Sequence, residues 1–289
     1  MSANTATKAR HRREDAEGAP IPILLYHSVS ADPAGWIAPY TVTPEAFAHH
    51  VDVIASSERN AITVSRLCEA LRGESKMPPR PVVITFDDGF ADFADAAAAL
   101  GRNQIPSTLY VTTGALQGRG PRPTEMAIPA TPMLDWSQLA ELELSGVEIG
   151  AHTHTHRQLD TMPTKEVADE LRQSKQMLED ELGHEVPSFA YPHGFHCSRI
   201  RRAVATVGHT SACAVMNALS SQRDELFSLA RLTVRATTTP DQIATWLDGR
   251  DARIAPYRER FRTKAFRAYR RARGSRSARG VIDLSASTY

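Results

Sequence analysis

The sequence predicts an α/β protein built on a distorted (β/α) barrel of about seven strands. Three observations support this prediction. Between residues 20 and 249, short apolar runs alternate with longer segments of helical periodicity, as in parallel βα units. Most of the apolar runs are continuous, which is typical of strands covered on both faces. Polar clusters follow several runs, and a barrel brings the carboxyl ends of its strands together around one mouth.

The predicted strands are apolar runs, and the predicted helices are segments in which apolar residues recur at three- and four-residue steps. In chain order, the strands are Ile21–His27, Val82–Phe86, Thr108–Thr112, Val147–Ala151, Ser188–Tyr191, Thr210–Val215 and Leu232–Arg235. The helices are Pro44–Ser57, Val64–Leu71, Phe90–Gly101, Ser137–Leu144, Thr164–Gly183, Ser198–Val207 and Pro240–Leu247. About 230 residues with this alternation suit one barrel, residues 20–249, better than two domains.

Composition places the chain among ordinary globular proteins, with 42% hydrophobic and 23% charged residues. No stretch approaches the roughly 20 consecutive apolar residues that a membrane-spanning helix needs. The first 20 residues have no apolar signal-peptide centre, so we expect a cytoplasmic protein. The three cysteines, Cys68, Cys197 and Cys213, are odd in number and widely spaced, which predicts reduced side chains rather than disulfides or a thiolate metal site.

The two ends of the chain differ from the centre. Residues 1–19 are charged and almost free of apolar side chains, which predicts a disordered leader. Residues 250–289 carry twelve Lys or Arg against three acids, a charge of +9, and since the whole chain is +1 the remainder is −8. Within 255–279 the pattern fits a basic amphipathic helix that contacts an anionic membrane, or a solvated terminal helix and tail. Nucleic acid is not an expected partner, because the basic charge is confined to this tail.

Two adjacent carboxylates, Asp87 and Asp88, follow the apolar run at Val82–Phe86. Gly89 comes next and allows a tight exit from the strand. Like charges at adjacent positions repel each other unless a positive group lies beside them. The pair therefore indicates either a functional site or a turn that starts the following helix.

Three histidines, His152, His154 and His156, lie within five residues at the end of another predicted strand. Imidazole is the commonest protein ligand for zinc and similar ions. If the chain turns after His152, then His152 and His156 converge and Asp88 completes a site of two histidines and one carboxylate. If the segment stays extended, all three histidines share one face instead. The alternative is a set of surface histidines without a metal.

Thr85-Phe86-Asp87-Asp88-Gly89 followed by His152-Thr153-x-x-His156 resembles the first two motifs of the NodB-type polysaccharide deacetylases, carbohydrate esterase family four. The resemblance covers roughly residues 21–249. It implies a distorted (β/α) barrel, a divalent metal that is usually zinc, and hydrolysis of N-acetyl groups on amino sugars. It also implies that Asp87 is the general base and that Asp88, His152 and His156 are the metal ligands.

The third family motif contains an arginine that orients the base, and Ala190 occupies that position in this chain. Asp87 therefore needs another partner. Arg231, just before the last predicted strand, is the candidate substitute, and a surface salt bridge is the alternative interpretation of this arginine.

Substrate contacts are implied at two further places. Tyr191, Pro192 and His193 follow Ala190, and the resemblance makes the backbone N–H of His193 an oxyanion donor; a turn that closes the strand is the alternative. Trp136 is similar to the family tryptophan that walls one side of the sugar site, although a tryptophan at a helix start is more often part of the core.

The family's general acid is a histidine near the C-terminus, but this chain has no histidine after His209. Leu25-Tyr26-His27 closes the first predicted strand and resembles family members whose barrel is circularly permuted. The resemblance implies that His27 is the acid; a structural role is the alternative.

These features predict a zinc-dependent hydrolase that removes N-acetyl groups from an amino sugar or glycan precursor. The basic tail would hold this enzyme at the inner membrane face, near a lipid-linked or nucleotide-linked sugar. The first alternative is a hydrolase of other linear or cyclic amides on the same barrel, because a fold does not fix its substrate. The second is a non-catalytic protein that binds carbohydrate or membrane.

Overall fold

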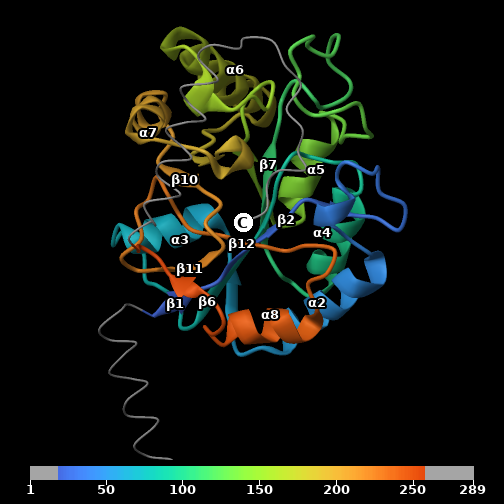
Figure 1. Cartoon of the computed structure of the whole chain (residues 1–289), viewed down its shortest axis with the longest axis vertical. Helices are drawn as coiled ribbons and strands as arrows, with labels where there is room; N and C mark the ends of the chain where they lie inside the picture. The colour runs from blue at the N-terminus through green and yellow to red at the C-terminus, as the bar shows by residue number, and fades with distance from the viewer. Residues whose placement is uncertain (1–18, 258–289) are drawn as a thin grey trace, which may run out of the picture.

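The computed structural model describes residues 19–257 (Figure 1). The leader predicted for residues 1–19 lies outside this range except for its last residue. Residues 258–289, which hold most of the predicted basic helix, also lie outside it. None of the helices within the described range is long and apolar enough to cross a membrane.

The centre of the fold is a curled sheet in which seven strands pair in parallel, in the order β10, β9, β8, β7, β6, β2, β12. Each of the seven strands lies within a residue or two of a predicted one, so the prediction of a distorted barrel is confirmed. Their bounds are β2 Ile23–Tyr26, β6 Pro81–Phe86, β7 Ser107–Val111, β8 Val147–Ala151, β9 Ser188–Ala190, β10 Ser211–Cys213 and β12 Leu232–Thr233.

Shorter strands surround this sheet. β5 (Asn60–Ile62) pairs with β6 and was not predicted, because one exposed polar residue and two half-buried apolar ones do not form a recognisable apolar run. β3 (Ser28–Val29) pairs with β4 (Thr41–Val42). A separate three-stranded sheet contains β1 (Pro20–Ile21), β11 (Ala218–Ser221) and β13 (Arg253–Ile254).

The barrel is distorted where its two edge strands face each other. Instead of a regular ladder, the segment before β12 follows the end of β10, and a single bridge joins Cys213 to Leu229. The amide of Leu229 donates to the carbonyl of Ala212 at 3.0 Å, and the amide of Ala214 donates to the carbonyl of Leu229 at 2.8 Å. This irregular segment leads directly to Arg231, which thereby enters the barrel interior.

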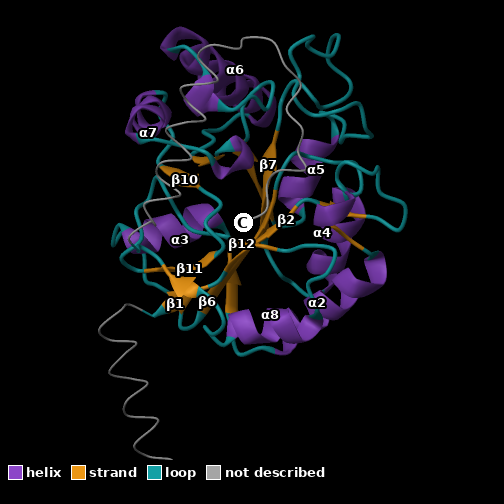
Figure 2. Cartoon of the chain, in the orientation of Figure 1, coloured by secondary structure: helices purple, strands orange, loops and turns teal. Residues whose placement is uncertain are grey.

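All seven predicted helices are present and lie around the outside of the curled sheet (Figures 1 and 2). Threonine side chains cap three of them: Thr43, Thr63 and Thr239 each accept a hydrogen bond from the amide three residues later. The helices are α2 Pro44–Ser56, α3 Val64–Leu71, α4 Phe93–Arg102, α5 Gln138–Leu144, α6 Thr164–Leu182, α7 Ser198–Thr206 and α8 Pro240–Leu247. Short 3-10 helices span Ala38–Tyr40, Leu159–Thr161 and Pro192–Gly194.

The alternation of side chains along each strand separates two cores. Val82, Ile84 and Phe86 of β6 belong to the larger cluster between sheet and helices, whereas Val83 belongs to a smaller cluster with Tyr110. Since side chains alternate with a period of two, the residues that follow Val83 on the same face of β6 are Thr85 and Asp87. The strand pattern therefore directs Asp87 into the barrel.

The described cysteines are free: Cys68 and Cys213 are buried and Cys197 is half-buried.

Candidate functional site

The site begins at the carboxyl ends of β6 and β8, which flank β7 in the sheet. On a regular strand, neighbouring side chains such as those of Asp87 and Asp88 would point to opposite faces. Asp88 adopts a left-handed conformation with φ 77°, and Gly89 follows with φ 89°. The backbone reversal lets both carboxylates reach one place, at the mouth of the barrel.

Asp88, His152 and His156 form a buried group of three side chains that could hold a metal ion, with one ligand atom from each within 4.8 Å of the others. Asp88 Oδ1 lies 3.1 Å from His156 Nε2 and 3.6 Å from His152 Nε2, and the two imidazole nitrogens are 3.2 Å apart. Asp88 Oδ1 is buried without a hydrogen-bond partner among the described residues. The three atoms thus converge on one point, as a two-histidine, one-carboxylate metal site requires.

The tautomer of His152 suits a metal ligand. His152 Nδ1 lies 2.8 Å from the carbonyl oxygen of Ala190, and a carbonyl only accepts, so Nδ1 carries the proton. Nε2 is then left with a lone pair directed at the site. Metal-binding histidines commonly donate their other N–H to a carbonyl or carboxylate in this way.

The chain turns after His152, which decides between the two geometries that the histidine cluster left open. Thr153 and His156 have positive φ values of 67° and 60°. His154 is directed away from the group: its Nδ1 lies 3.0 Å from the hydroxyl of Thr113, and its Nε2 lies 3.1 Å from the side chain of Gln173. The site therefore gathers His152 and His156 and excludes His154.

Arg231 pairs with Asp87 through two hydrogen bonds. Its Nη1 and Nη2 donate to the two carboxylate oxygens, each at 2.7 Å, and its Nε donates to the carbonyl of Ala214 at 3.1 Å. Arg231 is 0% exposed, so the alternative of a surface salt bridge is wrong. Ala190, at the end of β9, has no charged group to pair with Asp87. The guanidinium of Arg231, which directly precedes the edge strand β12, pairs with this carboxylate instead.

Burial and charge set the protonation of the group. Burial by itself would raise the pKa of Asp87 and Asp88, but the Arg231 charge for Asp87 and the His156 imidazole for Asp88 outweigh it and hold both pKa values below their usual range. Burial lowers the pKa of His152 to about 4. An ionised carboxylate and a neutral imidazole are the states that bind a metal, so Asp88 and His152 fit a divalent cation.

His27 follows β2 and lies half-buried at the same mouth. Its ring centroid is 5.3 Å from that of Tyr40, and its buried Nδ1 has no hydrogen-bond partner among the described residues. Burial lowers the pKa of His27, while the charges of Asp88 and Asp87 raise it. His27 is therefore near the paired carboxylates, as its place at a strand end predicts.

The three residues after Ala190 lie in different surroundings. Tyr191 is fully buried and donates its hydroxyl proton to the carbonyl of Phe227 at 3.0 Å, and Pro192 is also buried. His193 is half-buried, and its ring centroid is 4.7 Å from that of His156. Of the three, His193 is the one whose side chain contacts the histidine pair.

Trp136 is a buried residue of the core. Its side chain is 3% exposed and packs in the larger hydrophobic cluster, beneath the guanidinium of Arg119 at 4.7 Å. The core role weighed for this residue fits its burial, and its part in the sugar site stays a prediction.

Two contacts of the site were not foreseen. The carbonyl of Ala190 fixes His152, and the ring of Tyr40 lies against His27. A backbone acceptor has no signature in the sequence, and Tyr40 belongs to a connecting segment whose path only the fold defines.

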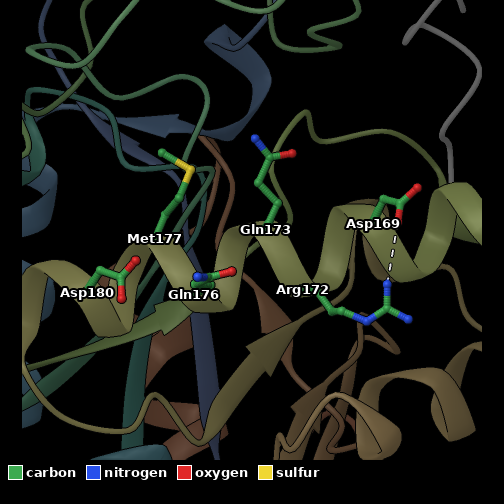
Figure 3. Close-up of a pocket in the computed structure, with 6 residues that line it drawn as sticks. All are labelled: Asp169, Arg172, Gln173, Gln176, Met177 and Asp180. Carbon is green, nitrogen blue, oxygen red and sulfur yellow. Dashed lines mark hydrogen bonds and ion pairs between the residues drawn. The ribbon is translucent and has the colours of Figure 1, made fainter.

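A surface pocket lies elsewhere, along the outer face of α6 (Figure 3). It contains none of the candidate site residues; of its lining, Gln173 was named above as the partner of His154 Nε2. Its lining residues are Asp169, Arg172, Gln173, Gln176, Met177 and Asp180.

Comparisons with a family model and with a curated protein point to the same family. Residues 74–212 match the family model for polysaccharide deacetylase. The Bacillus subtilis (strain 168) protein YxkH, named as a polysaccharide deacetylase, is 23% identical over 217 residues, which cover 75% of this chain and 72% of that protein.

Solved structures share the fold. Streptococcus pyogenes deacetylase PplD in complex with acetate has a TM-score of 0.69 at 21% identity, and the match covers 78% of this chain and 97% of that one. IcaB from Ammonifex degensii has a TM-score of 0.67 at 22% identity, with 79% and 97% covered. The family model, the curated relative and the shared barrel agree with the two motifs: residues 74–212 form a polysaccharide deacetylase domain, similar to the NodB-type enzymes of carbohydrate esterase family four, hydrolases that act on N-acetyl amide bonds.

Proposed function

We propose that this protein is a zinc-dependent enzyme that removes N-acetyl groups from an amino sugar or glycan precursor. The observation that carries the proposal is the buried Asp88, His152 and His156 group directly beside the Asp87–Arg231 pair. The three residues of the first group would hold the metal. A bound divalent ion would supply a Lewis acid for the acetyl carbonyl and lower the pKa of a water to about 7.

Asp87 is placed to remove the proton of the attacking water. Its Oδ2 lies 3.8 Å from His152 Nε2, beside the point on which the ligand atoms converge. Arg231 keeps this carboxylate ionised and holds both oxygens in a fixed plane through its two hydrogen bonds. Each oxygen retains a second lone pair, so Asp87 can accept a proton while it is paired.

His27 is placed to donate a proton to the leaving amine. Burial lowers the pKa of this imidazole, and a lower pKa makes the protonated form a stronger acid. The backbone N–H of His193 supplies the oxyanion donor in this proposal, next to His156. Trp136, Tyr191 and Pro192 support the site from the core rather than contact the sugar.

The test measures bound zinc by elemental analysis and acetate release from substrates that contain N-acetylglucosamine. We expect about one equivalent of zinc in the wild type and in Asp87→Asn, no acetate release by Asp87→Asn, and loss of zinc in His152→Ala. Loss of zinc from Asp87→Asn would overturn the assignment of the base. Turnover of cyclic ureides or imides in place of N-acetylated sugars would instead identify an amide hydrolase of different specificity.

The carrier of the sugar is a second part of the proposal. We propose a cytoplasmic enzyme whose basic segment at 255–279 contacts an anionic membrane and a lipid-linked or nucleotide-linked substrate. Ala255 donates to the carbonyl of Leu219, so a truncation should keep residues up to 257. Flotation with anionic liposomes should recover the full chain and lose the chain without residues 258–289; equal recovery of both would contradict membrane contact.

A further inference from the structure

We propose that Glu170, on the buried side of α6, is a positioning residue for the metal-binding turn His152–His156. The proposal rests on the metal-dependent function proposed above and names a residue outside its ligand set.

The carboxylate of Glu170 gathers the hydrogen-bond donors of the turn. Glu170 is 7% exposed, which is unusual for a glutamate. Its Oε2 accepts from the backbone N–H of His154 at 2.9 Å and from that of Thr155 at 2.8 Å, and its Oε1 accepts from the hydroxyl of Thr155. Hydrogen bonds to a charged acceptor are stronger than neutral ones. One side chain thus fixes two consecutive backbone groups between the two histidine ligands.

The turn needs such support because its backbone is unfavourable by itself. Thr153 and His156 are left-handed, at φ 67° and 60°, and neither is glycine. Each such residue costs about 1–2 kcal/mol, with a β-branched side chain such as that of Thr153 among the least suited. Within the turn, the amide of His156 donates to the hydroxyl of Thr153 at 3.0 Å. The contacts of Glu170 add a second, external restraint.

The opposite side of the turn is held by the loop after β7. The amide of Gly114 donates to the carbonyl of His154 at 2.9 Å, and the amide of Thr113 donates to the carbonyl of Thr153 at 3.2 Å. This loop therefore fixes carbonyl groups, whereas Glu170 fixes N–H groups. Removal of Glu170 releases one side of the turn only, which is the geometry expected of a positioning residue rather than of a core residue.

The first measurement needs no metal. We compare hydrogen exchange of the metal-free full chain with that of Glu170→Ala, by mass spectrometry with residue-resolved fragmentation. Faster exchange at the amide of His156, which Glu170 does not contact, would show that the whole turn loosens. Asp169→Ala is the matched control, because Asp169 is the preceding residue of α6 and is exposed. Exchange at His156 equal to that of the control would overturn the proposal.

The second measurement is zinc affinity by competition with a chelating dye. We expect the zinc Kd to rise roughly 10- to 100-fold in Glu170→Ala, as for other residues that support metal ligands, and saturating zinc to restore turnover with an unchanged KM. Glu170→Gln keeps the shape, an acceptor for the two amides and a donor for the hydroxyl of Thr155, so its Kd should rise less. A Kd in Glu170→Ala equal to that of Asp169→Ala would contradict the proposal.

Failure of this proposal is distinguishable from failure of the proposed function. A wild type that binds no zinc refutes the metal-dependent function, and the exchange measurement still decides whether Glu170 orders the turn. If Glu170→Ala unfolds, as circular dichroism would show, Glu170→Gln serves for both measurements. Loss of melting temperature without a change in zinc Kd or in exchange at His156 would assign Glu170 to general stability instead.

Discussion

The mouth of the barrel and the outer face of α6 both carry several charges, but the charged side chains at the mouth are buried and those on α6 are exposed to solvent. At the mouth, the Asp87 and Arg231 side chains of one ion pair are 4% and 0% exposed. On α6, Asp169 pairs with Arg172 (Figure 3). Asp169 also pairs with Lys165, and these three side chains are 49% to 89% exposed. Solvent screens the α6 pairs, whereas the charges at the mouth depend on one another because they have lost their hydration. The candidate site therefore lies where a charged side chain is most costly to bury without a partner.

The largest effect should come from breaking the buried pair. Arg231→Met leaves the Asp87 carboxylate buried and unpaired, and we expect a loss of about 3–5 kcal/mol of unfolding free energy. Urea denaturation of the metal-free protein measures this loss. In the double variant Asp87→Leu/Arg231→Met, both charges are gone, so most of the stability should return. A double variant as unstable as Arg231→Met would show that packing, rather than the unpaired charge, is responsible.

Two glycines with similar backbones sharpen the comparison. Gly194, near the mouth, has φ 70°, and a Cβ at this position would lie 2.5 Å from the backbone nitrogen of Val215. Gly183, which ends α6, has φ 74° and nothing within 4 Å of the corresponding point. We expect Gly194→Ala to cost about 2–4 kcal/mol and Gly183→Ala about 1–2 kcal/mol, since only the former adds a clash. Equal melting temperatures for the two variants would contradict this account.

The pH dependence of stability should also differ between the regions. Burial lowers the pKa of His152 to about 4, so between pH 6.5 and 4 the unfolded state binds a proton that the folded state does not. Metal-free protein should therefore lose stability as the pH falls through this range. His152→Gln should lose on the order of 1–3 kcal/mol less than the wild type.

For the exposed His184, the stability contribution should depend on pH with the opposite sign to that of His152. The hydrogen bond with Glu143 raises the pKa of His184 in the folded state. The stability that this pair contributes is present below the pKa of the unfolded state and disappears as the pH rises through the pKa of the folded state. Water screens the pair, and His184→Gln should change stability by less than about 1 kcal/mol. Denaturation curves from pH 4 to 8 test both histidines; a wild type and a His152→Gln variant with parallel pH profiles would refute the buried-imidazole argument.

The smallest effect is expected on α6 itself. Lys165→Ala removes an exposed i,i+4 pair with Asp169 and should cost about 0.3–0.5 kcal/mol, with less loss in 1 M salt. Thermal melts at low and high salt measure it. A cost above about 1 kcal/mol would show that the α6 face is not solvated as its exposure indicates.

Local sequence patterns determined most of the framework. The seven barrel strands and the seven helices follow from apolar runs and helical periodicity, and α3 and α8 have the predicted bounds. α4 starts at Phe93 instead of Phe90, because Phe90 forms a bridge with Met133 before the helix begins. Boundaries of this kind depend on contacts distant in sequence, whereas periodicity depends on residues within one element.

The sequence also determined which residue types meet at the mouth, since Asp87, Asp88, His152 and His156 stand at strand ends and carry the family motifs. Only the tertiary structure decided which other side chains pair with these residues. Arg231 is 144 positions from Asp87, and the distorted closure of the barrel brings them together. The tertiary structure also buries Trp136 and Tyr191 in the core, and it brings the carboxylate of Glu170 to the backbone amides of the histidine turn. The physical reason is that strand order and side-chain alternation are encoded locally, whereas the partner of a buried charge is chosen by the packing of segments far apart along the chain.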